Sequence, residues 1–183
     1  MDEYIELLNL DGTPNGMRCL KSVAHQKGHY HATVHVWIYT PNGEVLIQKR
    51  NPNKETFPDL WDVSVAGHIA FGETPALTAK REVLEEIGLN IQEKDLIEIG
   101  YSTHKNTHGA LLIDWELHHL FLYELADSDT VFNLQKEEVA AVKWISLKKL
   151  ETDLKRPKFS EGFVPHGNVY YAQIFNAIRK QRC

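Results

Sequence analysis

One predicted helix near the middle of the chain constrains the fold more than any other feature of the sequence. Thr74 followed by Pro75 is typical of a helix start, because threonine caps free backbone N–H groups and proline suits the first helical position. Gly88 is typical of a helix end, since glycine readily adopts the left-handed conformation needed there. The sequence therefore predicts a helix over residues 75–87 with both ends fixed.

Three carboxylates lie on one face of this predicted helix. Glu82, Glu85 and Glu86 are spaced i, i+3 and i+4, so their side chains project together. Like charges at this spacing repel one another in a helix with a purely structural role. Divalent cations resolve the repulsion, because carboxylate oxygens suit Mg²⁺ and Mn²⁺, which also bridge phosphates. A solvated acidic face is the alternative, and it leaves the framing glycines and the adjacent Arg81 without a role.

Strand patterns surround the helix. Side chains alternate along residues 31–40, with a period of two that is typical of a strand, and a Pro-Asn-Gly turn leads into a returning strand over 44–49. Further strands are predicted at residues 4–10, 61–66, 96–102, 111–123 and 141–145, and further helices at 20–27, 146–151 and about 165–181. This order predicts an α/β fold in which a mixed sheet lies between helices on both faces, an α/β/α arrangement.

Composition narrows the class of protein. The 183 residues suit a single domain, 43% hydrophobic and 25% charged residues are typical of a globular protein, and the net charge of −5 argues against a nucleic-acid partner. We find no run of about 18 apolar residues that could span a membrane. The N-terminal residues lack the pattern of a secretory signal, so we expect a cytoplasmic protein without a membrane partner.

Residues 67–89 carry a longer motif, GHIAFGETPALTAKREVLEEIGL. It matches the Nudix box, Gly-x5-Glu-x7-Arg-Glu-U-x-Glu-Glu-x-Gly-U with U a bulky aliphatic residue, at every defined position. The chain thus resembles Nudix hydrolases over the box. The resemblance implies a Nudix fold over residues 1–183, with residues 1–30 as an N-terminal extension. It also implies a metal-activated water that cleaves a diphosphate linkage.

The same resemblance assigns roles to residues of the box. It implies that the helix carboxylates and the Gly67 carbonyl ligate Mg²⁺ or Mn²⁺. It also implies that Arg81 pairs with Glu73 to lock the loop against the helix. The implied catalytic residues are Glu73, Arg81, Glu82, Glu85 and Glu86.

Over roughly residues 4–150 the chain also resembles isopentenyl diphosphate isomerase, itself a Nudix-fold enzyme. The segments that carry this resemblance are Lys21-x3-His25, His31, Arg50-x3-Lys54 and Trp61 to Gly67-His68. It implies a second manganese or magnesium site of three histidines and two carboxylates, here His25, His31, His68, Asp114 and Glu116. It further implies that a diphosphate contacts Lys21, Arg50 and Lys54. Considered one at a time, Arg50 and Lys54 are explained equally well as ordinary loop cations, and His25 and His31 as ordinary surface or strand histidines.

One position separates the chain from the isomerase. The isomerase has a cysteine just before the Gly-His pair, whereas this chain has Ala66, and neither Cys19 nor Cys183 matches that position. Alanine has no titratable group, so the isomerase route of proton transfer is disfavoured and hydrolysis is favoured. A non-catalytic nucleotide-binding Nudix module ranks last, because the glutamate set is complete. The expected substrate is a nucleoside diphosphate derivative or an isoprenoid diphosphate, and a homodimer is left open.

Several further residues are noted without a decided role. His118 and His119 are adjacent on a predicted strand and point to opposite faces, so they cannot share a site. His104 is expected in a polar loop that borders the pocket. Glu138, just before a strand, is either a further ligand or base, or a solvated residue. Residues 163–175 either cap the pocket or form a dimer contact.

Overall fold

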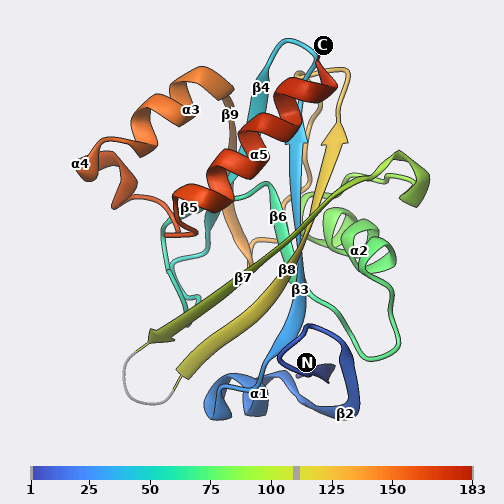
Figure 1. Ribbon diagram of the computed structural model, residues 1–183. Helices are drawn as coiled ribbons and strands as arrows, with labels where there is room; N and C mark the ends of the chain where they lie inside the picture. The colour runs from blue at the N-terminus through green and yellow to red at the C-terminus, as the bar shows by residue number, and fades with distance from the viewer. Residues whose placement is uncertain (1, 109–111, 183) are drawn as a thin grey trace.

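A mixed, curled sheet lies between helices in the computed structural model, which describes residues 2–108 and 112–182 (Figure 1). The strands are β1 (Tyr4–Leu8), β2 (Pro14–Leu20), β3 (His31–Tyr39), β4 (Glu44–Arg50), β5 (Trp61–Asp62), β6 (Val65–His68), β7 (Ile97–His108), β8 (Leu112–Glu124) and β9 (Val139–Ser146). The helices are α1 (Lys21–Lys27), α2 (Pro75–Ile87), α3 (Leu147–Leu154), α4 (Pro157–Ser160) and α5 (Asn168–Gln181), with a 3₁₀ turn at Glu93–Asp95. The predicted α/β fold with a mixed sheet between helices is confirmed.

The central helix α2 has the predicted ends. The Thr74 hydroxyl accepts a hydrogen bond from the Leu77 amide at 3.2 Å, and Gly88 adopts a left-handed φ of 72°. Ala79, Val83 and Ile87 are buried against the sheet. Burial of this apolar stripe fixes the rotation of the helix, and thus where its glutamates lie.

Alternation along β3 creates two cores. Val34, Val36 and Ile38 pack with α2, whereas Trp37 and Tyr39 pack with α3 and α5 on the opposite face (Figure 1). The side chains that continue the second face toward the start of β3 are polar and buried: His31, Thr33 and His35. One strand face therefore changes from apolar core to polar site along its length.

The parallel pairing of β3 with β8 extends this polar surface. His31 lies opposite Glu116 and Thr33 opposite His118, so the polar stretches of the two strands lie side by side. On its other edge β3 pairs with β6 in antiparallel fashion. The same sheet region therefore receives polar side chains from strands far apart in the sequence.

Ser64 joins β3 to β4 where the two strands separate. These strands pair only at Tyr39 and Val45, and the segment with β5 and β6 enters between them. The buried Ser64 hydroxyl accepts a hydrogen bond from the Ile38 amide at 2.8 Å and donates one to the Leu46 carbonyl at 2.6 Å. One side chain thus satisfies two backbone groups that the split would leave unpaired.

Some predicted boundaries were wrong. β2 was not predicted, and β7 continues to His108 rather than ending near residue 102, so His104 lies on a strand and not in a loop. The polar sequence of the second half of β7 is typical of a loop, but pairing with β8 keeps this segment extended. The predicted strand start at residue 111 lies outside the described residues.

In the described ranges we find no helix long and apolar enough to cross a membrane.

Ser64→Ala should lower the free energy of unfolding by about 1–3 kcal/mol, because it leaves a buried N–H and a buried carbonyl without partners. Urea unfolding followed by fluorescence measures this change. Ser102→Ala is the control, since the described residues include no hydrogen-bond partner for its hydroxyl. Equal stability of the two variants would contradict the role given to Ser64.

Candidate active site

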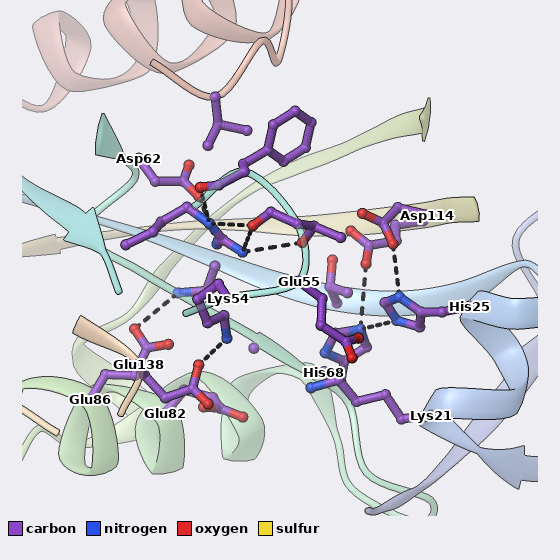
Figure 2. A pocket seen from close by; sticks show the side chains of 18 of the residues that line it. Lys21, His25, Lys54, Glu55, Asp62, His68, Glu82, Glu86, Asp114 and Glu138 are labelled. Carbon is purple, nitrogen blue, oxygen red and sulfur yellow. Dashed lines mark hydrogen bonds and ion pairs between the residues drawn. The ribbon is translucent and has the colours of Figure 1, made fainter. Parts of the chain in front are cut away.

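A pocket of about 920 Å³ gathers most of the residues singled out in the sequence. Figure 2 shows Glu82, Glu86 and Glu138 on one side of it, and His25 and other residues of α1, β6 and β8 on another. Of the predicted site residues, all line this pocket except Glu73 and His31, which lie directly behind lining residues. The strands and α2 therefore bring together residues that the sequence spreads over nearly a hundred positions.

Arg81 organises the loop and the helix that form one wall. Its Nε lies 3.2 Å from Glu73 Oε1, and its Nη2 donates to the His68 carbonyl at 3.2 Å. Its Nη1 donates to Glu82 at 2.7 Å and to Glu85 at 3.1 Å. One guanidinium therefore fixes the loop carboxylate, a β6 carbonyl and two helix carboxylates relative to one another.

Glu82 is partly buried and Glu86 is buried, and among the described residues only Glu82 has a cation, Arg81, within ion-pair distance. Burial raises the pKa of Glu82 to about 7, although Arg81 opposes the shift. Burial and the neighbouring Glu82 charge raise the pKa of Glu86 to about 8. Glu86 accepts hydrogen bonds from the Gln48 amide at 3.0 Å and the Ala66 amide at 3.4 Å. Such a pair needs protons or a cation to remain buried.

The absence of a side chain at Gly67 makes room for Glu82. A Cβ built on Gly67 would lie 2.1 Å from the Glu82 carboxyl carbon, far inside van der Waals contact. The glycine therefore allows the carboxylate to lie directly against the β6 backbone. This close approach places Gly67 and the Glu82 carboxylate side by side in the lining of the pocket.

The three predicted phosphate-binding cations differ in availability. Lys54 pairs with Glu138 across the pocket, and its positive charge partly opposes the rise in the Glu86 pKa. Arg50 directs its Nε and Nη2 atoms to the backbone of residues 56 and 57, and its Nη1 lies 3.2 Å from Asp62. Lys21 lies 3.9 Å from Glu3 at the pocket edge. Arg50 thus mainly shapes the loop, whereas each of the two lysines contacts a single carboxylate at the pocket.

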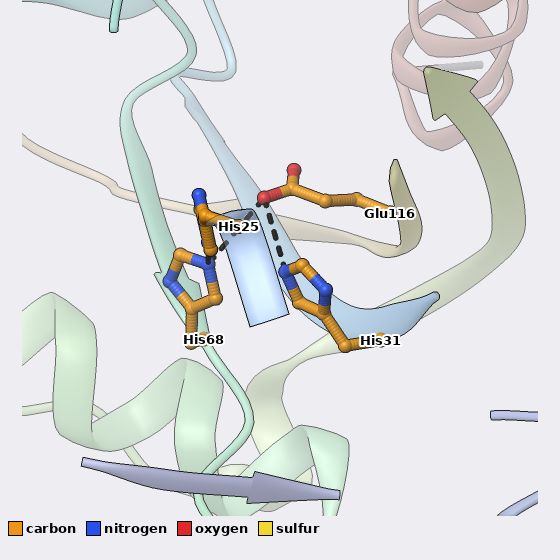
Figure 3. A group of neighbouring side chains, drawn as sticks. All are labelled: His25, His31, His68 and Glu116. Atoms are coloured by element: carbon orange, nitrogen blue, oxygen red, sulfur yellow. Dashed lines mark hydrogen bonds and ion pairs between the residues drawn. The ribbon is translucent and has the colours of Figure 1, made fainter. Parts of the chain in front are cut away.

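The histidines predicted for a second metal site converge (Figure 3). His25, His31, His68 and Glu116 each offer one ligand atom, and these atoms lie within 4.8 Å of one another. His31 Nδ1 lies 2.7 Å from the His29 carbonyl, and its buried Nε2 has no hydrogen-bond partner among the described residues.

This geometry fits a cation. The Nε2 atoms of His25 and His68 face one another at 2.9 Å, as two ligands of one ion would. A hydrogen bond from His31 Nδ1 to the carbonyl leaves the lone pair on the orphaned Nε2. Burial holds the pKa of His68 well below its ordinary value, so its ring is neutral. Neutral imidazoles and a carboxylate are the donors that a divalent transition metal accepts.

Asp114 occupies a different place from the other four. Its Oδ1 lies 2.7 Å from His25 Nδ1, the nitrogen that faces away from His68, and its Oδ2 lies 2.9 Å from His108. A carboxylate behind a histidine orients the ring and fixes its tautomer. Asp114 therefore lies against the far side of the His25 ring and outside the group of four ligand atoms, although the isomerase resemblance counted it among the ligands.

Sequence reasoning missed four residues on the far wall of the pocket: His35, Asp62, His118 and His166. The expectation that His118 and His119 face opposite ways is confirmed, since only His118 enters the pocket. The alternation of β3 already placed His35 on the face of His31. No local pattern pointed to His166, which precedes α5 and reaches Asp62 from 104 positions away.

Residues 163–175 are mainly core. Phe163, Tyr170, Tyr171 and Phe175 are buried in the cluster that packs against β3, so these aromatic side chains are not available for a surface contact. Val164 and His166 line the pocket, which means that the segment closes one end of it. Of the two predicted roles, the structure favours the pocket.

Comparison with known proteins identifies the family. Residues 29–166 match the NUDIX domain family model. The chain belongs to the Nudix family. It is 34% identical over its whole length to Nudix hydrolase 3 of Arabidopsis thaliana, although it spans only 24% of that protein. Nudix hydrolases generally use divalent metal ions.

Isomerases also occur among its relatives. An isopentenyl-diphosphate Delta-isomerase 2 of Photorhabdus laumondii is 32% identical over 82% of this chain and 81% of its own length.

A crystal structure of DR0079 from Deinococcus radiodurans has a TM-score of 0.62 and 19% identity, and the match covers 85% of this chain and 90% of that protein. The Nudix fold is thereby shown.

The buried carboxylates of this Nudix protein should make its metal-free stability depend on pH. In the folded state Glu82 and Glu86 keep protons that an unfolded chain releases above about pH 4.5. Glu82 therefore destabilises the fold progressively up to about pH 7, and Glu86 up to about pH 8. We expect Glu86→Gln to be more stable than wild type in EDTA, with a difference that grows from pH 5 to pH 8.

Thermal unfolding in EDTA across this range measures the difference. Glu85→Gln is the matched control, because the Glu85 side chain is 50% exposed. A difference that stays constant with pH for Glu86→Gln would show that the Glu86 carboxylate is ionised in the folded state.

Gly67→Ala should weaken Mn²⁺ binding by about 10–100-fold, the scale of losing a group that positions a ligand. The added methyl displaces the flexible end of Glu82 rather than backbone, so the thermal midpoint should change little. Mn²⁺ titration by electron paramagnetic resonance tests binding, and Gly162→Ala, on the segment before α5, is the control. Unchanged Mn²⁺ affinity in Gly67→Ala would remove Glu82 from the metal site.

Proposed function

We propose that the chain is a metal-dependent diphosphohydrolase acting on a small organic diphosphate. The observation that carries the proposal is the complete carboxylate set of α2, which faces one pocket and is held by Arg81. Burial raises the pKa of Glu86, and its carboxylate has no salt-bridge partner among the described residues. A purely structural role does not explain such a buried carboxylate. It fits a site that a divalent cation completes.

Glu82, Glu85, Glu86 and the Gly67 carbonyl would hold Mg²⁺ or Mn²⁺. A bound ion would neutralise charge on the diphosphate and lower the pKa of a water at the site. Arg81 and Glu73 keep the ligands in register, because one hydrogen-bond network joins the loop to the helix. Gln48 orients the Glu86 carboxylate by donating to its Oε2.

Lys54 and Lys21 would contact the phosphate groups. Lys54 lies on the loop that covers the helix carboxylates and can exchange its Glu138 partner for a phosphate oxygen. Arg50 would contribute indirectly to phosphate binding, because its hydrogen bonds to the backbone of residues 56 and 57 hold the loop that carries Lys54. Glu138, predicted to be either a further ligand or base or a solvated residue, would then set the position of Lys54.

The lining of the pocket favours a polar organic group on the diphosphate. Its side chains are mainly charged or histidine, and the apolar ones are scattered: Phe57, Ala66, Leu112 and Val164. An isoprenoid chain needs a continuous apolar surface. We therefore place nucleoside diphosphate derivatives ahead of isoprenoid diphosphates.

Isomerisation of isopentenyl diphosphate is the second candidate, favoured by the grouping of His25, His31, His68 and Glu116. Ala66 opposes it, because its methyl group offers no proton and its amide is already directed to Glu86. The two reactions differ in product, since only hydrolysis releases phosphate or a monophosphate.

The test is a product screen with Mg²⁺ or Mn²⁺ against nucleoside diphosphate derivatives and isopentenyl diphosphate. We expect release of a monophosphate or phosphate from at least one polar substrate. Glu86→Gln should lower kcat by about 10²–10³-fold, the scale of removing one charge-stabilising group. Glu98→Gln, exposed on β7, should leave it unchanged.

Two results would contradict the proposal. Conversion of isopentenyl diphosphate to its isomer without phosphate release would favour the second candidate. Absence of any product, in a protein shown to bind Mn²⁺ and its substrates, would indicate a binding module.

A further inference from the structure

A second group of three histidines lies in the pocket, on the side of Glu116 away from the cluster of Figure 3. His35 comes from β3, His118 from β8 and His166 from the segment before α5. Each offers one ring nitrogen, and these three atoms lie within 4.8 Å of one another. None of the three has a role in the proposed hydrolysis.

Each ring is held by a hydrogen bond at one nitrogen. His35 Nδ1 lies 2.8 Å from the Tyr170 hydroxyl, His118 Nδ1 2.7 Å from the Thr33 hydroxyl, and His166 Nε2 2.7 Å from Asp62. Among the described residues, the other nitrogen of each ring makes no hydrogen bond. A hydrogen bond at one nitrogen that leaves the second available is the usual arrangement of metal-binding histidines.

The supporting groups are themselves fixed. Asp62 is buried, and His166 together with Arg50 at 3.2 Å overcomes the effect of burial and holds its pKa below the ordinary value. An ionised Asp62 accepts the Nε2–H of His166, which places the lone pair on Nδ1. The Tyr170 oxygen accepts a hydrogen bond from Trp37 Nε1 at 2.9 Å, so the partner of His35 is anchored in the core.

Burial of these three rings costs free energy unless their polar atoms interact with a partner. His35 and His118 are less than 5% exposed, and the side chain of His166 is 6% exposed. The rings of His35 and His118 stack face to face at 4.0 Å between centroids. A structural core of this size would normally be filled by apolar side chains.

We propose that His35, His118 and His166 bind a transition-metal ion, such as Zn²⁺ or Co²⁺, at a site distinct from the α2 glutamates and from the His25 cluster. Three imidazole nitrogens select such ions over Mg²⁺, which prefers oxygen ligands. All three residues line the pocket, so an ion there would keep a coordination position open to it.

Variants that remove the free nitrogen and keep the hydrogen bond test the site. Asparagine places its amide near the Nδ1 position of histidine and glutamine near Nε2. His35→Asn and His118→Asn therefore retain the bonds to Tyr170 and Thr33, and His166→Gln retains the bond to Asp62. His119→Asn is the matched control, since His119 is adjacent on β8 but faces Glu98.

The measurement is Zn²⁺ binding by calorimetry and Co²⁺ absorption on the full chain, without substrate. A His31→Asn background removes the orphaned Nε2 of the other cluster. In this background we expect an equivalent of Co²⁺ with an intense, nitrogen-rich visible spectrum, distinct from the weak absorption of any Co²⁺ held by oxygen ligands at the α2 glutamates. Each cluster variant should weaken that binding by more than about 100-fold, beyond the loss typical of an outer-shell partner.

Unchanged Co²⁺ binding in two of the folded cluster variants, or no binding in the His31→Asn background, would overturn the proposal. Thermal unfolding of the metal-free variants shows which are folded, and three independent variants make the test robust to one that is not. Because the readout is metal binding alone, the result does not depend on whether the chain hydrolyses a diphosphate.

Discussion

The parallel pairing of β3 with β8 is the interaction on which the pocket depends. It sets His31 beside Glu116 and Thr33 beside His118, and places two apolar stretches side by side further along. α5 covers the apolar end, where Trp37 packs against Tyr170 and Tyr171 (Figure 1). The polar end continues beyond the start of that helix. A slip by one residue would send every polar side chain to the opposite face, so strand register and site geometry are inseparable.

Buried carboxylates in this pocket fall into two electrostatic classes. Burial opposes the ionised form of Glu116, but the close approach of His31 and His68 holds its pKa well below the ordinary value. His166 and Arg50 lower the pKa of the buried Asp62 in the same way. Among the described residues Glu86 has no ion-pair partner, and burial raises its pKa to about 8. The protein thus neutralises some buried carboxylates with its own groups but not Glu86. This contrast supports the proposed cation at Glu86 on grounds independent of the motif.

How much could be predicted depended on whether a residue was fixed by local or by distant contacts. The limits of α2 and the shared face of its glutamates follow from local spacing, and the sequence predicted both correctly. Gly67 was found through the motif, but its reason, the contact with Glu82, is tertiary. His166 and Asp62 were missed because their partnership joins distant segments. The length of β7 was also missed, since an exposed strand held by pairing has no apolar pattern.

Glu116 lies between two groups of histidines and connects them. Its Oε1 lies 3.5 Å from His31 and 3.4 Å from His68, while its Oε2 lies 3.5 Å from His118 Nδ1. One carboxylate therefore faces both groups of histidines, one oxygen toward each. A change of charge in either group acts on the other through Glu116, because the two groups share this buried carboxylate.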